Sequence, residues 1–151
     1  MITRLLCTFT LVAFGCGGSA SSESDSSQSD SGGHNDGAPL PAFIDVRIAF
    51  FGAGCTEGGC HNSDSKGGLN LVDDMWAALV NVPAATCKDG RKLVVPGKPS
   101  ESYIVNKVRG TRLCSGDRMP LGCGEPNGGV CFSEERLATL EGWIRSGAPM
   151  E

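Results

Sequence analysis

The sequence is poor in aromatic residues and in histidine. Aromatic side chains make up 6% of its 151 residues, and His34 and His61 are its two histidines. Neither a Gly-x-Ser-x-Gly nucleophile turn nor a paired-carboxylate signature stands out, so the sequence does not predict an enzyme. Basic residues are also outnumbered, with 13 Lys and Arg against 17 Asp and Glu. This balance argues against a nucleic-acid partner.

The N-terminus has the features of an export signal. Arg4 precedes an apolar run over residues 5–14, which is too short to span a bilayer, and Gly15 precedes Cys16. The stretch ending at Cys16 resembles a bacterial lipobox, although Ala13 stands where leucine is most usual. We expect residues 1–15 to be removed and Cys16 to carry a lipid that anchors the protein to the bacterial cell envelope. The alternative is an ordinary signal peptide with another cleavage site, and either signal exports the chain.

Two further regions follow the signal. Residues 16–38 consist almost wholly of small and polar residues, His34 among them, and cannot bury a core, so we expect a disordered tether. Residues 39–151 then form one domain of ordinary size. Loss of the signal removes Arg4 and no acid, which leaves 12 basic and 17 acidic residues and a net charge of −5.

The apolar spacing predicts a small, mainly α domain with long loops. Ser133 is the expected N-cap of the clearest helix, which Gly147 ends. One face of this helix carries the apolar stripe Leu137, Leu140, Trp143 and Ile144.

Three other helices are expected, with weaker patterns. One covers residues 42–51 and leads into the first cysteine motif. A short one near residues 73–79 should turn Trp76 and Leu79 inward, and Ser100 is the expected N-cap of a third that runs through Val108.

Six cysteines remain in the domain once Cys7 leaves with the signal and Cys16 is lipidated. An even number in an oxidising compartment favours disulfides. The turn-prone segment between Cys123 and Cys131 suits a bridge, which leaves Cys87 to pair with Cys114. Four cysteines allow three pairings, so the others stay open. A zinc site built from these residues is a further alternative, although their spacings match no standard zinc module.

The remaining pair, Cys55 and Cys60, belongs to the most informative motif of the chain. Cys60 directly precedes His61, and four residues separate the two cysteines. A c-type haem site has two cysteines separated by two residues and a histidine directly after the second. Gly58 and Gly59 would let the longer segment bulge. The alternative is a small Cys55–Cys60 disulfide with His61 merely next to it.

Met119 is the best candidate for a second iron ligand. A thioether favours ferrous iron and raises its reduction potential. Pro120 follows it directly and would fix the chain beside the sulfur. The alternative is an ordinary methionine of the core or of a loop.

The order of these motifs resembles exported cytochrome c-like domains. Cys60-His61 is followed by a Gly-Gly-Leu-Asn-Leu segment at 67–71, then by Met119-Pro120, and then by a closing helix that contains Trp143-Ile144. The resemblance implies a helical fold around one covalent haem c, with the first and last helices packed together. It implies Cys55 and Cys60 as thioether residues, His61 as the proximal ligand and Met119 as the distal ligand. The four-residue gap departs from the family pattern.

These observations give two functional expectations. The first is a membrane-tethered monohaem protein that passes single electrons to extracytoplasmic redox partners. The second is a haem-free lipoprotein domain, held by disulfides, that binds a partner or supports an envelope complex.

Overall fold

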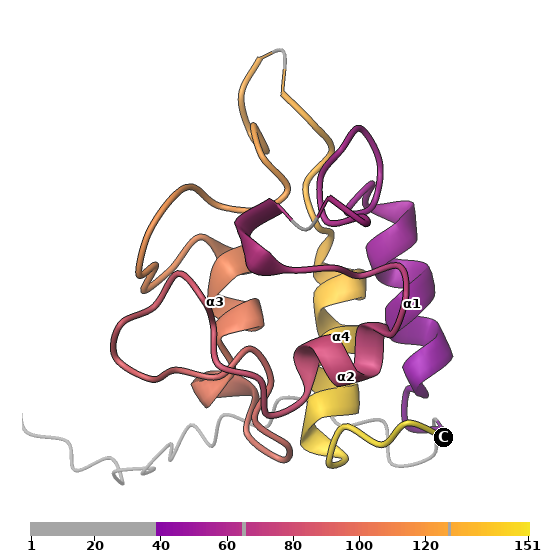
Figure 1. The fold of residues 1–151 in the computed structure, drawn as a ribbon. Helices are drawn as coiled ribbons and strands as arrows, with labels where there is room; N and C mark the ends of the chain where they lie inside the picture. Colours follow the sequence, from indigo (N-terminus) through magenta and orange to yellow (C-terminus); the bar gives the residue numbers. More distant parts are fainter. Residues whose placement is uncertain (1–38, 65, 127) are drawn as a thin grey trace, which may run out of the picture. The chain divides into compact units, whose positions relative to one another are not determined.

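The computed structural model describes residues 39–151, apart from 65 and 127, as a mainly helical unit (Figure 1). The predicted signal, tether and lipidated Cys16 lie outside the described residues. No helix within the described residues is long and apolar enough to cross a membrane. The helices, in chain order, are α1 (Phe43–Gly52), η1 (Lys66–Gly68), α2 (Met75–Leu79), η2 (Pro99–Glu101), α3 (Tyr103–Arg109) and α4 (Glu134–Arg145), of which η1 and η2 are short 3-10 helices. In the same residues, β structure is limited to two isolated bridges, Val80 with Val94 and Pro83 with Lys92.

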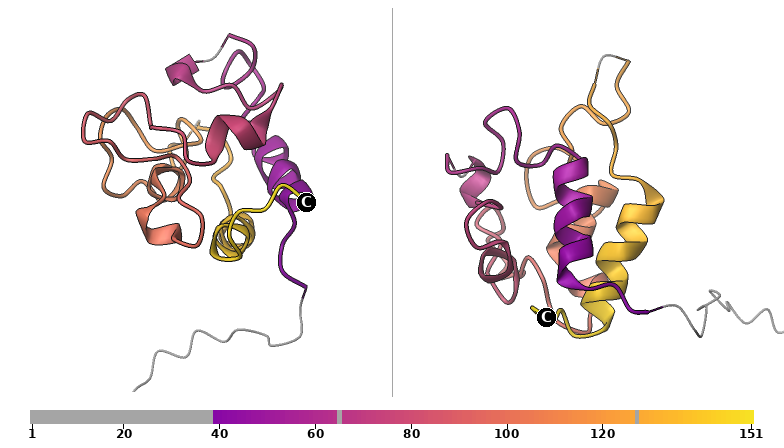
Figure 2. Two further views of the ribbon diagram at one scale, coloured as in Figure 1. Left: turned by 60° about the horizontal axis from the view of Figure 1, so that its bottom comes forward. Right: turned by 90° about the vertical axis from the view of Figure 1, so that its right-hand side faces the viewer.

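Helices α1 and α4 lie side by side, as all views show (Figures 1 and 2). The ring of Phe43 on α1 lies 5.4 Å, centroid to centroid, from that of Trp143 on α4. Trp143 is fully buried and its indole N–H donates a hydrogen bond to the carbonyl of Pro149, 2.8 Å away. Helix α3 packs against the other side of α4, so α4 is the central element of the unit.

Helix α4 forms where the sequence predicts it. The Ser133 side chain accepts a hydrogen bond from the backbone N–H of Arg136, which satisfies one of the free donors of the first turn. The four apolar residues of its predicted stripe are all buried. The local signals for this helix therefore agree with its tertiary packing.

Helix α1 is confirmed at residues close to those expected. Its first turn is stabilised by Asp45, whose carboxylate accepts a hydrogen bond from the backbone N–H of Ala42 at 2.8 Å. Val46 and Phe50 are buried in the core, whereas Ile48 is exposed. The helix is apolar on both faces, which explains why the sequence shows no clean helical period.

The structure corrects two details of the other helices. In α2 the buried residues are Met75 and Leu79, while Trp76 is half-buried and donates its indole N–H to the carbonyl of Ala148. Helix α3 has Ser102, not Ser100, at its N-cap position. The Ser102 hydroxyl does not cap the helix, because it donates to the carbonyl of Lys98 and accepts from the N–H of Val95. Backbone contacts of the preceding loop, which the sequence pattern does not reveal, decide that boundary.

We expect Leu140→Ala to lower the free energy of unfolding by roughly 2–5 kcal/mol, because this side chain of α4 is 0% exposed in the core and its loss leaves a cavity. The same change at Leu40, which is 59% exposed, serves as the matched control and should cost under about 0.5 kcal/mol. Urea unfolding of both variants measures the difference. Equal losses would mean that α4 is not the centre of the core.

Candidate functional site

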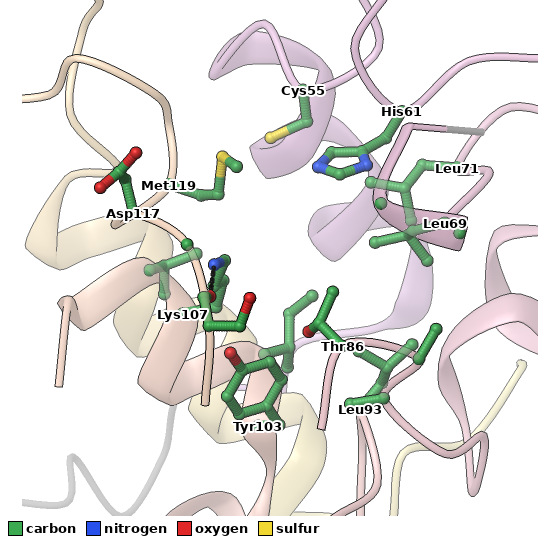
Figure 3. Close-up of a pocket in the computed structure, with 18 of the residues that line it drawn as sticks. Cys55, His61, Leu69, Leu71, Thr86, Leu93, Tyr103, Lys107, Asp117 and Met119 are labelled. Atoms are coloured by element: carbon green, nitrogen blue, oxygen red, sulfur yellow. Dashed lines mark hydrogen bonds between the residues drawn. The ribbon is translucent and has the colours of Figure 1, made fainter. Parts of the chain in front are cut away.

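A cavity of about 310 Å³ opens beside the C-terminal end of α1 and one face of α3 (Figure 3). This volume is at the lower end of the range of small-molecule sites, which are typically apolar with a few convergent polar groups. Segments 67–71, 83–86 and 115–121 complete its walls. The apolar side chains that line it include Phe50, Leu69, Leu71, Leu93, Ile104 and Val108.

His61 points its imidazole into this cavity (Figure 3). Its Nδ1 lies 2.9 Å from the backbone carbonyl of Lys66. Because a carbonyl only accepts hydrogen bonds, Nδ1 donates in this contact, and Nε2 is the ring nitrogen left for another partner. This is the arrangement of a metal-binding histidine, whose second nitrogen donates to a carbonyl or carboxylate that fixes the ring.

The segment between Cys55 and His61 is a closed loop. The backbone N–H of His61 donates to the carbonyl of Cys55 at 3.0 Å. Gly58 and Gly59 have φ angles of +57° and +74°, in the region that glycine adopts at little cost. The two glycines therefore accommodate the four-residue gap as a bulge, in agreement with the sequence analysis.

The two cysteines of the motif occupy different environments. Cys55 is half-buried and lines the cavity, whereas Cys60 is exposed and is not among the lining residues. Neither is in a disulfide, so the structure does not contain the alternative Cys55–Cys60 bridge. Burial, with a smaller contribution from the neighbouring Cys60, raises the pKa of the Cys55 thiol to about 11. The thiol is therefore neutral at physiological pH.

Met119 also lines the cavity, on the side opposite His61, and the Cys55 sulfur lies between them in the view of Figure 3. The structure thus brings together three of the four residues predicted to hold haem, namely Cys55, His61 and Met119. It does not bring Cys60 to them.

The Met119 loop is attached to the C-terminal end of α3. The backbone N–H of Met119 donates to the carbonyl of Lys107 at 3.0 Å, and Nε of Arg118 donates to the carbonyl of Val108 at 2.9 Å. The Lys107 ammonium donates to the carbonyl of Ser115. The first two bonds satisfy carbonyls of Lys107 and Val108 in the last turn of α3, and all three fix the loop that carries the thioether.

Sequence reasoning missed the groups that position the site. Lys66 acts through its backbone carbonyl, which every residue type possesses, so no sequence signal identifies it. Arg118 precedes Met119 directly, and that adjacency is the only sequence clue to its positioning role. Tyr103, the single tyrosine, lines the cavity and its hydroxyl accepts the backbone N–H of Cys114.

Two disulfides are present, Cys87–Cys114 and Cys123–Cys131, the pairing that the sequence analysis favours. The first joins the cavity wall at 83–86 to the start of the Met119 loop.

Ligand atoms of Cys87, Asp89 and Cys114 lie within 4.8 Å of one another. Zinc ligation needs thiolates, which a disulfide cannot supply. Hydrogen bonds from Arg91 hold the Asp89 carboxylate and lower its pKa.

Comparisons with known proteins identify no relative. No protein-family model matches the chain, and neither the curated proteins nor the solved structures give a match. The functional argument therefore rests on the residues of the site.

The two disulfides should differ in their contribution to stability. The cysteines of the first pair are 27 residues apart and those of the second 8, and a longer loop costs the unfolded chain more entropy when it is closed. Chain-entropy arguments therefore give a loss in the free energy of unfolding of about 3.6 kcal/mol for Cys87→Ala/Cys114→Ala and about 2.6 kcal/mol for Cys123→Ala/Cys131→Ala. Thermal unfolding of both double variants tests this order. A larger loss for the shorter loop would show that native contacts, rather than loop length, dominate.

Proposed function

We propose that this protein is an extracytoplasmic, membrane-tethered electron carrier that binds one haem c in the cavity beside α1 and α3. His61 would be the proximal ligand and Met119 the distal ligand, with thioether attachment through Cys55 and Cys60. Haem supplies reversible one-electron chemistry when bound. An extracytoplasmic redox protein would be the partner.

The observation that carries the proposal is the hydrogen bond that orients the His61 ring. Its Nδ1–H donates to the Lys66 carbonyl, so Nε2 is the nitrogen left for a metal. The same apolar cavity holds a thioether from Met119 and a thiol from Cys55. A histidine, a methionine and a cysteine lining one apolar space supply three of the four protein groups of a c-type site.

The protein side chains account for the expected properties of such a site. If His61 and Met119 both held the iron, no position would be left for a substrate, so we propose electron transfer rather than catalysis. The apolar side chains of the lining would lower the polarity around a bound haem, and a thioether ligand would favour its reduced state. The hydrogen bonds of Met119 and Arg118 to α3 hold the distal loop.

Attachment through Cys60 requires a change in the loop. Cys55 already faces the cavity, whereas Cys60 is exposed outside it. Gly58 and Gly59 can absorb the backbone rotation that would bring the second thiol inward.

The location is supported by the two disulfides, which persist in oxidising compartments outside the cytoplasm. Lipidation at Cys16 is part of the proposal and rests on the signal-like N-terminus.

A haem-free binding or structural module is the second candidate. The exposed position of Cys60 favours it, because a thiol outside the cavity is not placed for attachment. In this case the cavity would bind an apolar group without covalent bonds.

His61→Ala should reduce covalent haem in the matured protein to background, because it removes the proximal ligand and the residue that follows Cys60. His34→Ala, at the other histidine of the chain, is the matched control and should leave haem content unchanged. Haem absorbance per polypeptide measures both. Undiminished haem in the His61 variant would refute the assigned ligand.

Met119→Ala should lower the reduction potential of the haem protein, because a thioether ligand stabilises ferrous iron. Met150→Ala, at a methionine that is 57% exposed, should leave the potential unchanged. A redox titration followed by absorption makes the comparison. The assignment of Met119 fails if both variants keep the potential of the unaltered protein.

A further inference from the structure

Helix α3 borders a second recess on the face turned away from the cavity. Its residues Tyr103, Ile104, Lys107 and Val108 line the cavity, whereas Val105, Asn106 and Arg109 line the recess. The recess consists of two adjoining hollows of about 450 and 480 Å³, and Ser100, Asn106 and Arg112 line both of them. We call the two hollows together the α3 groove.

Asn106 marks the point where the two hollows meet. It is only 7% exposed and its side-chain amide makes no hydrogen bond within the described residues, yet no fully buried side-chain N or O atom there lacks a partner. The amide atoms are therefore reached by solvent, and Asn106 lines both hollows, so they are open to the groove. The amide lies where a ligand in the groove would meet it, and it can both donate and accept hydrogen bonds.

Positive charge surrounds this amide. The basic residues that line the groove are Arg91, Lys92, Arg109, Arg112 and Arg145, against the acids Asp89, Glu101 and Glu141. Each of these acids already binds a basic side chain: Asp89 binds Arg91, Glu101 binds Lys98, and Glu141 binds Arg109. Arg112 and Arg145 have no ion-pair partner in the described part of the chain. The groove therefore keeps two guanidinium groups free to bind an anion.

This charge is a local feature of the domain. Residues 39–151 contain 12 basic and 13 acidic residues, so the positive groove is balanced by acids elsewhere, such as Asp73 and Asp74 beside α2. A guanidinium binds carboxylates through two parallel hydrogen bonds. Arg112 lines both hollows and Arg145 lines one of them, so two free cations lie along an extended, open recess rather than around one enclosed point.

We propose that the α3 groove docks an acidic segment of a partner polypeptide, with its carboxylates on Arg112 and Arg145 and its backbone on the Asn106 amide. An extended segment fits two adjoining hollows better than a single small anion does. This docking site is separated from the cavity by the width of α3, and it does not depend on haem binding.

The test uses the full chain and an eight-residue peptide of alternating Glu and Ser. We expect the peptide to shift the side-chain amide resonances of Asn106 and to bind more weakly as salt is added. A peptide with Gln in place of Glu should not bind. Arg112→Gln combined with Arg145→Gln should weaken binding at least tenfold, because two charge-assisted contacts are lost. Arg47→Gln removes an exposed cation from α1 and should change affinity less than twofold.

Three outcomes would overturn the proposal. One is no shift at Asn106 with the acidic peptide. Another is equal weakening by the groove variants and by Arg47→Gln, which would indicate attraction to overall charge alone. The third is that inorganic phosphate shifts Asn106 while the peptide does not, which would make the groove a site for a small anion.

Discussion

The packing of α1 against α4 is the constraint on which the rest of the structure depends. The fully buried Trp143 contacts Phe43 of α1 and donates its N–H to Pro149, which fixes the two ends of the domain to each other. Helix α1 leads directly into the Cys55–His61 loop, and α3, packed on the other side of α4, carries the loop of Met119. The walls of the cavity therefore face each other because both are anchored to α4.

The elements that the sequence predicts well are those with strong local signals. Helix α4 has a serine cap, acids in its first turn and a regular apolar stripe, and these agree with its buried face. The loop at Cys123 to Cys131 is short and rich in turn residues, so its closure follows from composition. The glycine bulge before Cys60 could likewise be inferred, because only glycine adopts two successive positive φ angles at little cost.

Other features depend on tertiary contacts that leave no local pattern. The sequence motif gives Cys55 and Cys60 the same predicted role, yet the path of the loop leaves Cys55 half-buried and Cys60 exposed. The hydrogen-bond acceptor of His61 is a backbone carbonyl, and the burial of Met75 in place of Trp76 follows from how α2 lies on the core. The chain thus specifies which residues could form the site, while packing decides which of them meet.

Intact mass of the chain purified from its native host, with its absorption spectrum after reduction, tests the central claim most directly. The account predicts the chain from Cys16 onward, heavier by one haem and by the lipid on Cys16, with sharp c-type bands and with the hydrogens of two disulfides absent. A polypeptide without haem, whether Cys55 and Cys60 are free or joined in a third disulfide, would contradict it. The cavity beside His61 would then belong to a haem-free module.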